Sequence, residues 1–182
     1  MAKEQVLIVI DVQNGFLDPS WGRSNNPECE NNIRSLLGHW RANGWPIVLV
    51  RHDSVSPYST LRPNQVGNDF QDGVDGHKDL LISKTVNSAF YGEPNLETWL
   101  KDKGYSRIAI CGITTNHCCE TTARMAGNLG FVVDFIIDAT RTFDFKDPNG
   151  ELVLASEMAR ITATNLNGEF ARIRFTDEML LT

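Results

Sequence analysis

Three residues of this 182-residue chain have side chains suited to nucleophilic chemistry, and each lies close to a short apolar run. Asp11 follows the apolar run 6–10 directly, Lys84 ends the run 80–84, and Cys118 comes soon after the run 108–111. A carboxylate beside a thiol can take its proton, and a lysine can keep that carboxylate ionised and favour the thiolate. These residue types therefore indicate hydrolysis through a cysteine nucleophile.

The chain has four cysteines, Cys29, Cys111, Cys118 and Cys119, and none forms a C-x-x-C pair. We expect neither a disulfide framework nor a zinc site, because no second Cys/His cluster has ligand spacing. Cys118 falls in the first turn of a helix predicted over 115–129, where free N–H groups and the helix dipole favour a thiolate. Position alone favours Cys118 only slightly over Cys119, and Cys111 is expected to be a buried strand residue.

Strands and helices that alternate along the chain must position these residues. The patterns predict strands over residues 6–10, 46–50, 79–84, 107–111, 131–137 and 170–175, and helices over 31–43, 95–102, 115–129 and 151–166. This alternation predicts an α/β fold: one domain over 1–182, a three-layer α-β-α sandwich with a mostly parallel, Rossmann-like sheet of about six strands. Ligands bind beyond the carboxyl ends of such strands, so Asp11, Lys84 and Cys118 are expected to converge there.

Composition and charge limit the classes of partner. The chain is 41% hydrophobic and 22% charged, as is usual for a globular protein, and its net charge of −6 argues against nucleic acid. No apolar run approaches the ~20 residues that cross a bilayer, and the start of the chain does not resemble a signal peptide. We therefore expect a cytoplasmic protein that acts on a small molecule, with no nucleic-acid or membrane partner.

Three segments resemble motifs of the isochorismatase-like cysteine hydrolases, a superfamily that includes isochorismatases, nicotinamidases, N-carbamoylsarcosine amidases and ureidoacrylate amidohydrolases. Residues 9–16, V-I-D-V-Q-N-G-F, resemble the opening strand with the catalytic aspartate, and residues 84–90, K-T-V-N-S-A-F, resemble the lysine motif. Residues 112–123, G-I-T-T-N-H-C-C-E-T-T-A, resemble the nucleophile motif G-x-x-T-x-x-C-V-x-x-T-A. The resemblance covers nearly the whole chain and places Cys118, rather than Cys119, at the nucleophile position.

The resemblance implies a catalytic triad of Asp11, Lys84 and Cys118. Asp11 would take the thiol proton, the Cys118 thiolate would attack a carbonyl carbon, and water would resolve the thioester. A cis peptide bond between Ile113 and Thr114 is also implied, with the N–H groups of Thr114 and Cys118 binding the oxyanion. Because the family commonly forms dimers or larger assemblies, we expect a homo-oligomer, and we expect no cofactor.

Two features of the sequence bear on the bond that is cleaved. Nicotinamidases carry an Asp-x-His metal motif after the second strand, whereas this chain has Arg51-His52-Asp53, so neither a metal nor nicotinamide is expected. His52, Asp53 and His77 are expected to form hydrogen bonds within loops rather than to hold a ligand. Retention of Cys118 favours an amide, a ureide or another C–N bond.

Two other functions stay open at this point. Isochorismatases proper hydrolyse a vinyl ether and can dispense with the cysteine, so an ether hydrolase that uses Asp11 without a covalent step is the first alternative. A non-catalytic or thiol-redox protein that uses Cys118 and Cys119 is the second. The predicted substrate-binding residues adjoin the motifs or lie in nearby loops, and they are Phe16, Phe90, His117, Gln13, Tyr91 and Phe143.

Overall fold

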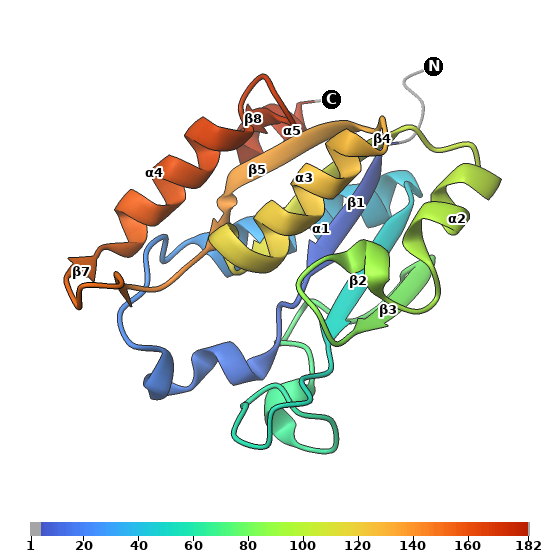
Figure 1. Ribbon diagram of the computed structural model, residues 1–182. Coiled ribbons are helices and arrows are strands. Elements are labelled where there is room, and N and C mark those ends of the chain that lie inside the picture. Colours follow the sequence, from blue (N-terminus) through green and yellow to red (C-terminus); the bar gives the residue numbers. More distant parts are fainter. Residues whose placement is uncertain (1–4, 182) are drawn as a thin grey trace.

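The computed structural model describes residues 5–181 and is built around a six-stranded sheet (Figure 1). Its strands are β1 (Val6–Ile10), β2 (Ile47–His52), β3 (Leu80–Lys84), β4 (Arg107–Ile113), β5 (Val132–Arg141) and β8 (Arg172–Arg174). They lie in the spatial order β3-β2-β1-β4-β5-β8, and every neighbouring pair is parallel. The predicted parallel sheet is therefore confirmed, and its order reverses direction between β1 and β4.

Helices cover both faces of this sheet. Helices α1 (Cys29–Asn43) and α5 (Thr176–Leu180) pack on one face, and α2 (Leu96–Asp102), α3 (Glu120–Asn128) and α4 (Ala155–Leu166) pack on the other. Successive residues of a strand point to opposite faces, so Leu7 and Val9 join the core beneath α1 while Ile8 and Ile10 join the opposite core. The whole of β1 is buried, as is typical of a central parallel strand. The predicted three-layer α/β fold is confirmed.

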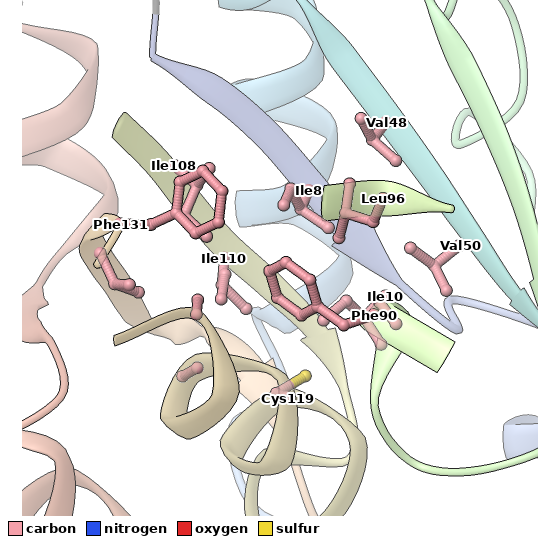
Figure 2. Packing of buried hydrophobic residues seen from close by; sticks show 14 of the residues in the cluster. Ile8, Ile10, Val48, Val50, Phe90, Leu96, Ile108, Ile110, Cys119 and Phe131 are labelled. Carbon is pink, nitrogen blue, oxygen red and sulfur yellow. The ribbon is translucent and has the colours of Figure 1, made fainter. Parts of the chain in front are cut away.

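The core between the sheet and helices α2 and α3 contains Cys119 and Phe90, which belong to the segments that resemble the nucleophile and lysine motifs. Figure 2 shows Cys119 and Phe90 among the aliphatic side chains of β1, β2 and β4. Cys119 is fully buried in this cluster, and the ring of Phe90 lies 5.9 Å from that of Phe131. Both side chains therefore contribute to packing beneath the helices.

Local signals in the sequence explain where several helices begin and end. Gly44 ends α1 in a left-handed conformation with φ of 65°, which glycine adopts without steric cost, and its N–H donates to the carbonyls of Trp40 and Arg41. Asn95 begins α2 by accepting a hydrogen bond from the backbone N–H of Thr98 at 2.9 Å.

Within residues 5–181, no helix combines the length and the apolar character needed to cross a membrane.

Several segments differ from the predicted elements. Residues 115–129 do not form one helix, because a π-helical turn η5 (Thr115–Cys119) precedes α3. Residues 151–154 do not open α4, because β7 (Leu152–Val153) pairs in antiparallel fashion with β6 (Phe145–Lys146). The carboxylate of Asp144 then accepts from the N–H of Ala155 at 2.7 Å, which fixes the start of α4. Helix α5 was not predicted, and β5 extends to Arg141, beyond the predicted end at residue 137.

The connections at the carboxyl ends of the strands carry short 3-10 helices. These are η1 (Asn14–Leu17), η2 (Pro19–Trp21), η3 (Val66–Asn68) and η4 (Ala89–Tyr91). In Figure 1 the segment with η1 and η2 and the loop after β2 both lie at the end of the sheet to which β1 and β2 point. The long excursion over residues 53–79 therefore lies at the edge where ligands bind in folds of this class.

Candidate active site

The site begins at the end of β1, where the direction of strand order reverses. Asp11 follows this strand with φ of 54°, a left-handed conformation that aspartate tolerates better than most residues, and its side chain is fully buried. The backbone N–H of Asp11 donates to the carbonyl of Val50 in β2 at 2.9 Å. The neighbouring strand therefore holds Asp11 in place while its carboxylate points away from solvent.

Gly112 lets β4 approach β1 closely at the same level. It pairs with Ile10 across the two strands and has φ of 134°. A Cβ atom at this position would lie 2.0 Å from the carbonyl oxygen of Ile10 and 2.7 Å from its nitrogen. Because no side chain fits there, glycine is required for the strand that leads to η5 and Cys118 to pass beside Asp11.

Lys84 connects the acid to the thiol. Its ammonium nitrogen lies 2.6 Å from Oδ2 of Asp11, 3.0 Å from Nδ1 of His52 and 3.4 Å from Sγ of Cys118. An ammonium group has three N–H donors, and here three acceptors surround it. The side chain of Lys84 is fully buried, so these contacts use all of its donors within the described residues.

The surroundings of Cys118 favour the protonated form of its thiol. Burial raises the pKa of this thiol well above its ordinary value, and the Asp11 carboxylate raises it further, while Lys84 opposes both effects. Oδ1 of Asp11 is buried and has no hydrogen-bond partner among the described residues. The carboxylate therefore retains a free oxygen that can accept the proton of a nearby thiol.

Lys84 remains a cation in this environment. Burial by itself lowers the pKa of the Lys84 ammonium, but the Asp11 carboxylate and the Cys118 sulfur together raise it above its ordinary value. A carboxylate oxygen of Asp11, a ring nitrogen of His52 and Sγ of Cys118 lie within 4.8 Å of one another and include atom types that bind metals. The Lys84 ammonium contacts all three residues, so its charge fills the position that a metal ion would take, and this cluster does not fit a metal.

A short turn with a cis peptide bond separates β4 from the cysteine. The peptide bond between Ile113 and Thr114 is cis, as the family resemblance implies. Cys118 then lies in the π-helical turn η5 rather than in the first turn of an α-helix, and turns of this kind are frequent at functional sites. The hydroxyl of Thr114 lies 3.2 Å from Nδ1 of His117, which joins the start of η5 to its middle.

A cavity of about 160 Å³ opens onto Cys118. It is lined by Phe16, Trp21, His52, Ser59, Leu61, Asn87, Thr114, His117 and Cys118. Pockets for drug-sized ligands measure roughly 300–1,000 Å³, so this cavity suits a smaller molecule. Asp11 and Lys84 lie behind Cys118 as a fully buried layer, so a ligand would meet the thiol first.

The chain is similar to known proteins over most of its length. Residues 5–165 match the family model described as the isochorismatase domain. The chain belongs to the isochorismatase family. The Bacillus subtilis isochorismatase family protein YrdC is 39% identical over 99% of this chain and 96% of its own length. Nicotinamidase 3 of Arabidopsis thaliana is 30% identical over 79% of this chain and 76% of its own length.

A solved structure supports the same assignment. The crystal structure of an isochorismatase-family protein from Chromobacterium violaceum has a TM-score of 0.93 to this chain at 38% identity. The likeness covers 100% of this chain and 94% of that one. The chain is thus an isochorismatase-family hydrolase.

In this family member, the predicted substrate-binding residues divide into two groups. Phe16 and His117 line the cavity. Gln13, Phe90 and Phe143 are buried outside its lining, and Tyr91 is 72% exposed and also lies outside it. The ring centroid of Phe143 lies 5.1 Å from that of Trp21 and 6.2 Å from that of Phe16. Phe143 therefore packs against two aromatic side chains that line the cavity.

The position of His52 differs from the expected one. This residue was expected to form a hydrogen bond within a loop, but it is the last residue of β2, pairs with Lys84 in the sheet register, and lines the cavity. The predicted strand ended at residue 50, whereas β2 continues to His52 and thereby brings it beside Lys84. The carboxylate of Asp53 accepts from Arg51 at 2.9 Å and from Asn68 at 3.0 Å, so Asp53 supports the loop as expected.

Proposed function

We propose that this hydrolase cleaves a C–N bond of a small amide or ureide through a thioester on Cys118. The observation that carries this proposal is the position of Lys84, whose ammonium contacts both Asp11 and Cys118 behind the wall of the cavity. An acid, a cation and a thiol in mutual contact form the arrangement that activates a cysteine nucleophile. A relative named for an amidase activity, Nicotinamidase 3, supports a C–N bond as the target.

The proposed reaction begins with a neutral thiol. Asp11, whose Oδ1 has no hydrogen-bond partner among residues 5–181, takes the Cys118 proton as the sulfur attacks the carbonyl carbon of the substrate. The C–N bond then breaks, and Asp11 returns the proton to the departing nitrogen. A water molecule then loses a proton to Asp11 and attacks the thioester carbon. The C–S bond breaks, Asp11 returns the proton to the departing sulfur, and the acid product leaves the restored thiol. Lys84 stays cationic throughout and stabilises the carboxylate and the developing thiolate.

The tetrahedral intermediate requires donors for its oxyanion. We assign this role to the backbone N–H groups of Thr114, which directly precedes η5, and of Cys118, which lies within η5; both residues line the cavity. The loss of one such donor in hydrolases typically costs about 10²–10³ in kcat. Backbone donors do not depend on side-chain identity, so this part of the proposal predicts a tolerance to conservative substitution of the Thr114 side chain.

The lining of the cavity bears on the alternative reaction. Isochorismate carries two carboxylates, and a buried anion needs a cation or several donors to offset its lost hydration. Of the residues that line the cavity, none is an arginine or a lysine, and the buried Lys84 already has three acceptors. A neutral amide or ureide is therefore the better match, and the vinyl ether remains the comparison substrate.

A turnover screen with mass detection of the intermediate tests the proposal. The purified wild-type enzyme is incubated with small neutral amides, ureides and isochorismate, and reactions with turnover are quenched in acid. Intact-mass analysis should show an enzyme heavier by the acyl group of the substrate, with the adduct mapped to the peptide that contains Cys118. Turnover of isochorismate alone, with no adduct and no loss in the Cys118→Ala variant, would contradict the thioester mechanism.

A further inference from the structure

We propose that His52 determines substrate specificity by donating a hydrogen bond from Nε2 to a second acceptor on the substrate, separate from the carbonyl that Cys118 attacks. The substrate class is thereby narrowed to neutral amides or ureides that carry another carbonyl oxygen or ring nitrogen near the scissile bond. This inference rests on the proposed C–N hydrolysis and assigns a role to a residue outside the Asp11, Lys84 and Cys118 group.

The backbone of His52 is held on both sides by one side chain. The amide oxygen of Gln13 accepts from the N–H of His52 at 2.8 Å, and the amide nitrogen of Gln13 donates to the carbonyl of His52 at 3.1 Å. Gln13 is fully buried, and Asn68 donates to the same carbonyl at 3.1 Å. A ring mounted on a backbone with this support is preorganised, which reduces the entropy lost when a ligand binds.

Lys84 determines where the ring carries its proton. The ammonium group has donors only, so the contact of 3.0 Å requires Nδ1 of His52 to act as the acceptor. A neutral imidazole with an unprotonated Nδ1 carries its hydrogen on Nε2. Burial and the Lys84 ammonium also lower the pKa of His52, which outweighs the opposing effects of Asp11 and Asp53 and keeps the ring neutral.

The Nε2–H group is available to a ligand. The ring lines the cavity with its side chain 15% exposed, and within residues 5–181 its hydrogen-bonding contact is the one that Nδ1 makes. The neighbouring Asp53 carboxylate is engaged by Arg51 and Asn68, so it does not take this proton. A ring nitrogen of His52 lies within 4.8 Å of Sγ of Cys118, so an acceptor bound to the ring would belong to the same small molecule as the scissile carbonyl.

Two amide substitutions separate the two ring nitrogens. In His52→Asn the side-chain oxygen can take the place of Nδ1 and keep the contact with Lys84, but no donor reaches the position of Nε2. In His52→Gln the side-chain nitrogen can take the place of the Nε2–H donor, but the acceptor for Lys84 is lost. The two variants therefore distinguish the hydrogen bond that His52 donates to the substrate from the contact between His52 and Lys84.

The kinetic test uses matched pairs of probes. Each pair contains a small β-keto amide and the amide in which a methylene replaces its ketone carbonyl, so the scissile bond and the leaving nitrogen are the same, and kcat/KM is measured for both members. We expect the wild type to prefer the β-keto amide by about 10–100-fold, the loss typical of one hydrogen-bonded pair left unmade. His52→Asn should lose this preference, mainly through KM, whereas His52→Gln should keep the preference and lower kcat for both members.

Three results would overturn the inference without touching the proposed thioester. One is a wild type that forms the Cys118 adduct but shows no preference across the pairs it turns over. Another is a preference that is unchanged in His52→Asn. The third is independent of any substrate: nitrogen NMR of the resting wild type at neutral pH should show His52 with its hydrogen on Nε2, and a hydrogen on Nδ1 would contradict the argument. Absence of the Cys118 adduct during turnover would instead contradict the proposed function itself.

Discussion

The ammonium nitrogen of Lys84 lies 2.6 Å from Oδ2 of Asp11, and both side chains are fully excluded from solvent. Removal of two charges from water is costly, so the loss of either partner would leave a buried charge without its counterion. Here the remaining donors of Lys84 contact His52 and Cys118. The pair is therefore sensitive to any change that removes one charge and leaves the other.

Replacement of Lys84 by methionine should destabilise the protein as well as abolish turnover. The substitution leaves the Asp11 carboxylate buried without its counterion, and the loss of one partner of a buried pair typically costs about 3–5 kcal/mol. Urea denaturation at neutral pH measures the change. The double variant Asp11→Asn with Lys84→Met should recover most of this stability while staying inactive, because it removes both charges. An equally large loss in the double variant would show that packing, rather than charge, explains the effect.

Substitution of the two adjacent cysteines should give opposite results. Cys118→Ala should reduce turnover by about 10³-fold or more with little change in the melting temperature, because it removes the proposed nucleophile at the cavity wall. Cys119→Ala is the matched control, since this thiol is fully buried in the core beneath α3. It should retain activity within a few-fold and lose about 1 kcal/mol of stability. Equal loss of activity in both variants would contradict the assignment of Cys118.

The four buried thiols should make the protein sensitive to alkaline pH. Burial raises the pKa of Cys29, Cys111, Cys118 and Cys119 above the value of 9.0 for an ordinary thiol. As pH rises through 9, the unfolded chain releases thiol protons that the folded chain retains, so the free energy of unfolding falls. Each thiol should contribute a decline of up to about 1.4 kcal/mol per pH unit in that range.

Melting temperatures between pH 8 and pH 11 measure this decline. Cys111→Ala serves as the control, because it removes one fully buried thiol away from the cavity. The variant should show a shallower decline with pH than the wild type, even if its stability at neutral pH is lower. A decline of the same slope in both proteins would assign the alkaline sensitivity to other groups.

Gly112→Ala should prevent the close packing of β4 against β1. The new Cβ would lie 2.0 Å from a backbone oxygen of Ile10, and backbone atoms in a central strand cannot move aside as a side chain can. The loss of stability should exceed the ~1–3 kcal/mol typical of overpacking. Gly130→Ala is a control with φ of 86° and no atom within 4 Å of its Cβ position, so it should cost only about 1 kcal/mol. Similar soluble yields and unfolding midpoints for both variants would contradict the steric argument.

Much of the architecture could be read from local patterns. The apolar run of β1, the helical periodicity before Gly44 and the turn residues between them reflect local backbone preferences and burial, which neighbouring residues encode. The same patterns placed Asp11 and Lys84 at strand ends, and the match to the family motif selected Cys118 from four cysteines as the predicted nucleophile. The π-helical turn before α3 was not predicted, because apolar periodicity continues through it without a break.

The sequence by itself thus determined the α/β fold, the family and the residues at the ends of the strands, because these depend on short segments and their order. Only the tertiary structure decided which side chains meet. The register between β2 and β3 pairs His52 with Lys84 and directs the histidine ring to the cavity. The packing of loops placed Phe90 and Gln13 outside it. Register and loop packing arise from contacts between residues far apart in the chain, which no local pattern specifies.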